Sequence, residues 1–177
     1  MRLPRFLSFC LVACLCLLAS GSAPAESRSG THVYLMRGLY NVSVGLDALA
    51  AKLVRRGIPA TVYARDEADT VTAAAIRDYN SGKARSIVLI GHSLGAGGAI
   101  MTAVRLEAAD VPVALLITLD PLSDGAVPGN VIRAVNFHVG GALVAGATNV
   151  NLSGQGLDHM AIQAADSMHQ RIMDYIR

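Results

Sequence analysis

The sequence predicts an α/β protein: one open, mainly parallel sheet of about five strands with helices on both faces. The first observation is that short apolar runs alternate with segments whose apolar residues recur at helical spacing. Strands joined through helices run parallel, with right-handed crossovers. The second observation is the composition, 53% hydrophobic and 16% charged over 177 residues. This balance fits one globular domain and argues against a disordered chain.

Five apolar runs predict strands, at 32–36, 60–64, 86–90, 113–119 and 131–139. The segments between and after them predict helices, at 46–57, 68–80, about 94–109 and about 160–176. Apolar residues line one face of the first helix, and Gly57 ends it. Only the stretch 140–158, rich in Gly, Ala and Asn, is a long segment without the apolar spacing of a helix or strand. A loop of that length is usually functional or mobile.

The first 25 residues predict a secretory signal peptide, which leaves 26–177 as a single mature domain. A basic start precedes a short apolar run, and Ala23-Pro24-Ala25 fits the A-x-A cleavage rule. The run is short for a membrane span, so an uncleaved anchor is the less favoured alternative. We therefore expect an exported protein, periplasmic or secreted, without a stable membrane span after cleavage.

All three cysteines lie inside the predicted signal, at Cys10, Cys14 and Cys16. The mature chain is thus expected to have no disulfide and no thiolate metal site. Lipoprotein processing at Cys14 is a minor alternative, because the residues after it stay apolar. The signal also holds two of the 15 basic residues, which leaves 13 basic against 13 acidic ones. No basic patch is expected, and hence no nucleic-acid partner.

The segment Gly91-His92-Ser93-Leu94-Gly95 predicts a nucleophile elbow, because it follows an apolar strand and opens a helix. Small neighbours let strand and helix approach closely around a strained serine. Ser93 would stand clear of the strand end, and the N–H of Leu94 at the helix N-terminus could stabilise an oxyanion. A glycine-rich turn with an incidental serine is the alternative. A phosphate loop is disfavoured, since no Lys-[Ser/Thr] follows the glycines.

A serine nucleophile needs a base that is oriented by a third group. For the acid, Asp120 follows the strand 113–119, and no Asp or Glu lies between His138 and Asp158. In open parallel sheets the reactive residues gather beyond the carboxyl ends of the strands, which favours Asp120. Asp124 is the runner-up.

For the base, His159 lies on the loop that enters the last helix, in the expected order Ser, Asp, His. His138 could instead be a structural histidine, and His169 is expected on the surface of the last helix. His92 is expected to face away from the serine and to pack in the fold.

A second oxyanion donor is expected from the loop after the first strand, in the segment "MRGLYN". Gly38 permits a tight turn there, and the N–H of Leu39 is the predicted donor. Apolar residues near the strand ends are the candidates for an acyl pocket, although some could equally belong to the core: Tyr40, Val42, Leu122, Val127 and Met160.

With these residues in place, the chain resembles the α/β-hydrolase superfamily over essentially 32–177. "GHSLG" is similar to the motif of its serine lipases, esterases and thioesterases, and "RGLYNVSVGLDALAAKL", "LDP" and "GLDHMAI" add to the likeness. The resemblance implies Ser93 as nucleophile, Asp120 as acid, His159 as base, and Leu39 and Leu94 as oxyanion donors. It implies a minimal fold, because the leading antiparallel strands are missing. Arg37-Gly38 replaces the usual His-Gly, and 121–130 is too short for a lid domain.

The expected function is an exported serine hydrolase that cleaves carboxylic ester or thioester bonds with short-to-medium acyl chains. The substrate would be a small-molecule or lipid-like ester, and neither a cofactor nor a metal is expected. An amide- or peptide-cleaving serine hydrolase and a non-catalytic binding protein on the same fold are the alternatives. The sequence leaves the oligomeric state open.

Overall fold

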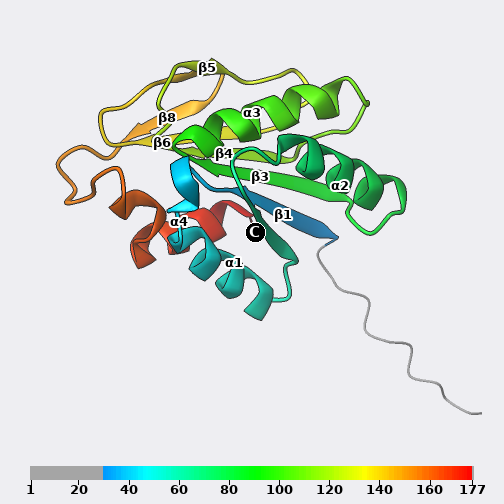
Figure 1. Ribbon diagram of the computed structural model, residues 1–177, viewed down its shortest axis with the longest axis horizontal. Helices are drawn as coiled ribbons and strands as arrows, with labels where there is room; N and C mark the ends of the chain where they lie inside the picture. The colour runs from blue at the N-terminus through cyan, green and yellow to red at the C-terminus, as the bar shows by residue number, and fades with distance from the viewer. Residues whose placement is uncertain (1–29, 177) are drawn as a thin grey trace, which may run out of the picture.

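Residues 30–176 are described by the structure, a computed structural model. The predicted signal peptide and its cleavage site lie outside these residues. In the described part of the chain, six parallel strands form the main sheet, in the order β2-β1-β3-β4-β6-β8 (Figure 1). The strands are β1 (Thr31–Met36), β2 (Ala60–Tyr63), β3 (Ser86–His92), β4 (Leu115–Leu119), β6 (Ala134–His138) and β8 (Thr148–Asn151).

Helices cover both faces of this sheet. The helices are α1 (Gly45–Arg55), α2 (Ala68–Asn80), α3 (Leu94–Glu107) and α4 (Asp166–Ile176). α1 and α4 pack on one face, and α2 and α3 pack on the other (Figure 1). The predicted α/β fold, with a mainly parallel sheet covered on both faces, is confirmed.

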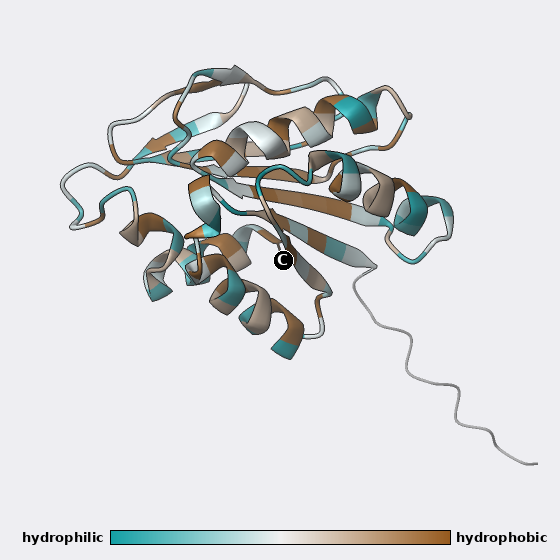
Figure 2. Cartoon of the chain, viewed as in Figure 1, coloured by the Kyte–Doolittle hydropathy of each residue, from teal (hydrophilic) through white to brown (hydrophobic). Residues whose placement is uncertain are grey.

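Side-chain alternation along the central strands divides the core into two clusters. On β1, Val33 and Leu35 face α1 and α4, whereas Tyr34 and Met36 face α2 and α3. The same alternation holds on β3, since successive side chains of a strand point to opposite faces. Both sides of these strands are therefore largely apolar. In the hydropathy colouring, β3 is brown over most of its length (Figure 2).

The parallel arrangement gathers the carboxyl ends of β1, β3 and β4 at one edge. Met36 pairs with Gly91, and His92 pairs with Leu119, so the three strands end level with one another. β3 lies between β1 and β4, and the chain leaves these three strands at Arg37, Ser93 and Asp120. This is the edge where open α/β sheets bind ligands.

The expected loop 140–158 is partly strand. It contributes β8 at the edge of the sheet, and β7 (Val144–Ala145), which pairs with β5 (Gly125–Ala126). The main sheet therefore has one strand more than expected. β4 and β6 are shorter than predicted, with an isolated bridge between Val113 and Val131.

The last helix begins later than the expected position near 160. A short 3-10 helix, η2 (Ala161–Gln163), precedes α4, which starts at Asp166. His169 on α4 is fully buried, so its expected surface position is wrong. Among the helices of residues 30–176, none has the length and apolarity that a membrane crossing requires.

Candidate active site

Ser93 stands at the sharp turn between β3 and α3, with a φ of 58° and a ψ of −124°. A positive φ is uncommon for a residue with a side chain and stores backbone strain. Gly91 and Gly95, two residues before and after Ser93, are required because no larger side chain fits there. A Cβ at Gly91 would lie 2.2 Å from the Gly95 carbonyl oxygen, and a Cβ at Gly95 would lie 2.3 Å from the Met36 carbonyl oxygen. The glycine pattern thus packs the elbow directly against the end of β1.

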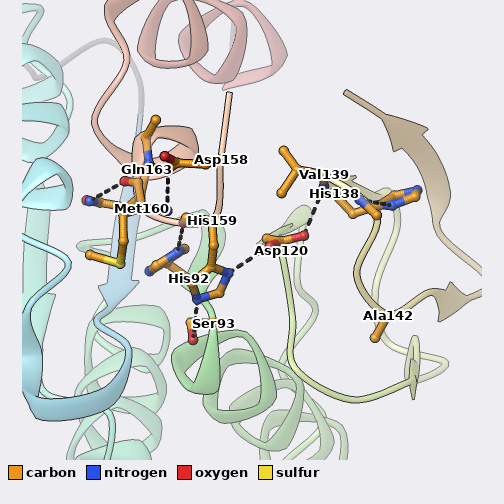
Figure 3. A network of polar contacts seen from close by, with 12 residues as sticks. His92, Ser93, Asp120, His138, Val139, Ala142, Asp158, His159, Met160 and Gln163 are labelled. Atoms are coloured by element: carbon orange, nitrogen blue, oxygen red, sulfur yellow. Dashed lines mark hydrogen bonds and ion pairs between the residues drawn. The ribbon is translucent and has the colours of Figure 1, made fainter. Parts of the chain in front are cut away.

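The structure brings Ser93, His159 and Asp120 into one hydrogen-bonded line (Figure 3). The Asp120 Oδ2 is 2.7 Å from His159 Nδ1, and His159 Nε2 is 3.1 Å from Ser93 Oγ. A carboxylate only accepts hydrogen bonds, so Nδ1 carries the proton and donates it to Asp120. Nε2 then holds a lone pair and accepts from the Ser93 hydroxyl. This is the arrangement that prepares a serine for nucleophilic attack.

Asp120 is held on both carboxyl oxygens. Its Oδ1 accepts the N–H of Val139 at 2.9 Å, at the end of β6. The residue is buried and has a positive φ of 46°, just after β4 ends. Gly141 leaves room for the carboxyl group, because a Cβ there would lie 2.7 Å from Asp120 Oδ1. The runner-up acid, Asp124, instead accepts the N–H of Leu143 at 2.8 Å.

The backbone around His159 is held by polar side chains that follow it along the chain. Asp158 Oδ1 accepts the N–H groups of Met160 at 2.9 Å and Ala161 at 2.7 Å. The Gln163 side-chain amide donates to the Met160 carbonyl at 2.9 Å (Figure 3). A loop position therefore still presents the imidazole in a defined place.

Each expected oxyanion donor is the first residue of a helical segment, a short and irregular one for Leu39 and a full α-helix for Leu94. Leu39 begins the 3-10 helix η1 (Leu39–Asn41), and Leu94 begins α3. The first N–H groups of a helix have no acceptor within it and can bind an anion. The loop that carries Gly38 and Leu39 packs against the serine, since a Cβ on Gly38 would lie 3.0 Å from Ser93 Cβ.

His92 does not face away from the site, so that expectation is wrong. Its Nδ1 is 2.7 Å from Ser43 Oγ, and its Nε2 is 2.8 Å from the His159 carbonyl oxygen. The rings of His92 and His159 lie 4.8 Å apart. Burial lowers the pKa of His92 below its usual value, which favours the neutral imidazole. Sequence reasoning missed Ser43 altogether.

A cavity of about 230 Å³ opens beside Ser93 and His159. Its lining includes four of the five predicted pocket residues, and most of its wall is apolar: Leu39, Tyr40, Val42, Leu122 and Met160. Val127 lies elsewhere, partly buried against the core on the α2 and α3 face. The space could accept an uncharged chain attached to a group at Ser93.

Two other histidines, His138 and His169, also lie outside the Ser93–His159–Asp120 line. His138 ends β6 and accepts the N–H of Gly140 at 3.4 Å, and His169 Nε2 is 2.9 Å from the Gln163 carbonyl oxygen. Within residues 30–176, no group of three or more His, Asp or Glu side chains is placed to hold a metal ion.

No protein-family model and no curated protein sequence matches the chain. Among solved structures it is similar to a candidate hydrolase of the alpha/beta superfamily from Xanthomonas campestris pv. campestris. The two share 15% sequence identity, and the match covers 81% of this chain and 98% of the other, with a TM-score of 0.48. A likeness this distant carries no conclusion about activity.

Proposed function

We propose that the protein is a serine hydrolase that cleaves carboxylic ester or thioester bonds, with Ser93 as nucleophile, His159 as base and Asp120 as the acid that orients the base. The observation that carries this proposal is the line from Asp120 through His159 to Ser93, with contacts of 2.7 and 3.1 Å. The strained elbow and the adjoining apolar cavity support it.

In the proposed reaction, Ser93 Oγ attacks the carbonyl carbon while His159 Nε2 takes its proton. Asp120 keeps the imidazole oriented and stabilises the imidazolium that forms. The N–H groups of Leu39 and Leu94 would hold the oxyanion of the tetrahedral intermediate. His159 then gives the proton to the leaving alcohol or thiol. Water, activated by the same imidazole, releases the acyl group from Ser93.

The cavity supports a substrate with a short-to-medium acyl chain. Its volume of about 230 Å³ must hold the reacting carbonyl group as well as the chain. Tyr40, Val42, Leu122 and Met160 line the cavity and are also exposed at the surface. An apolar rim of this kind favours an uncharged or lipid-like ester over a charged peptide. We further propose that the protein acts after export, as the N-terminal sequence predicts.

A fluorophosphonate probe tests the nucleophile without knowledge of the natural substrate. The purified protein is expected to gain the mass of a single adduct, whereas Ser93→Ala and His159→Ala gain none. Ser153→Ala, which changes an exposed serine, is the matched control and should label like the parent. Loss of Ser93 or His159 should lower turnover about a millionfold. A folded parent that takes no adduct would contradict the proposal.

Substrate class is then decided by comparing matched esters, thioesters and anilides of increasing acyl length. The proposal expects hydrolysis of the esters or thioesters and a fall in kcat/KM once the chain outgrows the cavity. Preferential cleavage of the anilides would favour the amide-cleaving alternative.

A further inference from the structure

His92 connects the two sides of the proposed active site. Its Nδ1 is 2.7 Å from Ser43 Oγ, and that hydroxyl accepts the N–H of Gly38 at 2.9 Å. Its Nε2 is 2.8 Å from the carbonyl oxygen of His159. Gly38 precedes the expected oxyanion donor Leu39, and His159 is the proposed base. His92 is thus linked to the backbone of both functional segments, directly at His159 and through Ser43 at Gly38.

The direction of each hydrogen bond follows from the groups involved. The His159 carbonyl oxygen is only an acceptor, so His92 Nε2 carries a proton and donates it. In a neutral imidazole, Nδ1 then holds a lone pair and accepts from the Ser43 hydroxyl. The Ser43 oxygen keeps lone pairs free for the Gly38 N–H. The chain therefore runs in one direction, from Gly38 N–H through Ser43 and His92 to the His159 carbonyl.

We infer that His92 is a positioning residue that sets the oxyanion loop and the catalytic histidine in register with Ser93, acting through Ser43 on one side and the His159 backbone on the other. This inference rests on the proposed function. His92 is suited to the task because it directly precedes Ser93 at the end of β3.

Burial makes this connection stiff and keeps it uncharged. Ser43 is fully buried, and His92 is 1% exposed, so water has little access to compete for their hydrogen bonds. The low-polarity surroundings lower the pKa of His92 and favour its neutral form. A charged His92 ring, 4.8 Å from the ring of His159, would repel the imidazolium that the proposed reaction forms. The neutral His92 ring imposes no such cost.

The two ends of the chain can be separated by substitution. His92→Gln can place an amide N–H near the Nε2 position and so keep the bond to His159. His92→Asn can place an acceptor near the Nδ1 position and so keep the bond to Ser43. His92→Phe keeps a ring of similar size and removes both bonds, and Ser43→Ala removes the hydroxyl alone.

The experiment measures kcat and KM on one ester, the fluorophosphonate labelling rate and thermal unfolding for these variants, the parent and Ser153→Ala. His92→Phe should lower kcat about 10- to 100-fold, since displacements near 1 Å cost that much. KM should change less than kcat, because the apolar residues that form most of the cavity wall remain in place. His92→Gln and His92→Asn should each recover part of the loss. Ser43→Ala should also lower kcat, and the loss in the double variant should be smaller than the product of the two single losses, because residues in one hydrogen-bonded chain are coupled.

An alkylboronic acid gives a second readout. It forms a tetrahedral adduct with an activated serine, so its inhibition constant should rise in the variants by the same factor as kcat/KM falls. A loss that came only from reduced folding would instead lower the fraction of labelled protein and leave this inhibition constant unchanged.

The outcomes separate the two proposals. A parent that labels, together with a folded His92→Phe variant whose kcat stays within about twofold, overturns the positioning role and leaves the proposed function standing. Additive losses in the double variant also overturn it. A parent that does not label overturns the proposed function and this inference together. If His92→Phe does not fold, Ser43→Ala provides the test, because it leaves His92 and its bond to His159 in place. A lower kcat in folded Ser43→Ala then supports the positioning role, and a kcat within about twofold of the parent overturns it.

Discussion

Gly95→Ala should disable the proposed active site by shifting the backbone next to it, without replacing any proposed catalytic residue. Gly95 lies on the first turn of α3, where a Cβ would stand 2.3 Å from the Met36 carbonyl oxygen and 2.4 Å from the Arg37 carbonyl oxygen. Both contacts are with backbone, which cannot rotate away. The added methyl group must therefore push α3 away from the segment that carries Gly38 and Leu39.

The size of the effect follows from these distances. Ordinary contacts of a Cβ begin near 3.4 Å, so the two segments must separate by about 1 Å. Overpacking of this kind destabilises a protein by about 1–3 kcal/mol. A 1 Å displacement of a group that stabilises the transition state lowers the rate about 100-fold. We expect both losses in Gly95→Ala.

Gly97→Ala is the matched control, two residues further along the same helix. A Cβ at Gly97 would have no atom within 4 Å. Alanine also favours the helix, so this variant should gain about 0.5–1 kcal/mol in unfolding free energy. Urea unfolding and the fluorophosphonate labelling rate measure the two quantities. If Gly95→Ala unfolds and labels like Gly97→Ala, the close approach of α3 to the oxyanion loop has been misjudged.

Three further outcomes follow from the site and its supports. Asp120→Asn should keep the fold and lower kcat by about ten thousandfold, since the amide carries no negative charge and can donate to His159 Nδ1, which favours the wrong tautomer; an ester assay retaining most activity would remove Asp120 from its role. Asp158→Ala removes the acceptor for the two N–H groups that follow His159, and should cost about 1 kcal/mol together with a lower kcat. Urea unfolding and the ester assay check it, and unchanged values in both would count against a held loop. Burial lowers the pKa of His169 despite its bond to the Gln163 carbonyl, so the unfolded chain binds a proton near pH 6 that the folded chain excludes. The free energy of unfolding should therefore fall below about pH 6.5, by up to about 1.4 kcal/mol per pH unit, and urea titrations at pH 7.5 and 5.5 should show a smaller fall for His169→Gln.

The central elements could be predicted because their sequence signals are strong. β1, β3 and β4 are buried on both sides, so each shows as a nearly continuous apolar run. β8 has no such signal. Its sequence, Thr148–Asn151, is mostly polar and exposed, because it pairs with β6 at the edge of the sheet. Hydrogen bonding to β6 makes it a strand, and no apolar pattern records that pairing.

The start of the last helix depended on a contact that is distant in sequence. The sequence predicts a last helix from about 160, and the chain does form the short η2 there. A Cβ at Gly45 would lie 2.5 Å from the Ala164 Cα, so this segment packs tightly against the start of α1. A regular helix from 160 does not form there, and α4 begins at Asp166.

Ser93, His159 and Asp120 could be predicted from their residue types and their positions after strands or before a helix. The residues that support them, His92 and Ser43, could not. Alternation along β3 places His92 on the face opposite to the next residue, which led to the expectation that it faces away. The positive φ of Ser93 ends that alternation, so both side chains turn toward His159. Ser43 carries no sequence signal at all, because its importance comes from burial beside His92.

The proposed site is built on close backbone contacts around Ser93 and is surrounded by exposed side chains at the cavity mouth. These two parts should tolerate amino-acid substitution very differently. Gly91 and Gly95 admit no larger residue, and their replacement disturbs the elbow itself. Tyr40, 84% exposed, and Leu122, 59% exposed, stand at the mouth of the cavity with most of their surface in solvent. Substrate preference could therefore diversify, in nature or in a mutant library, through the rim alone while the reacting centre stays the same.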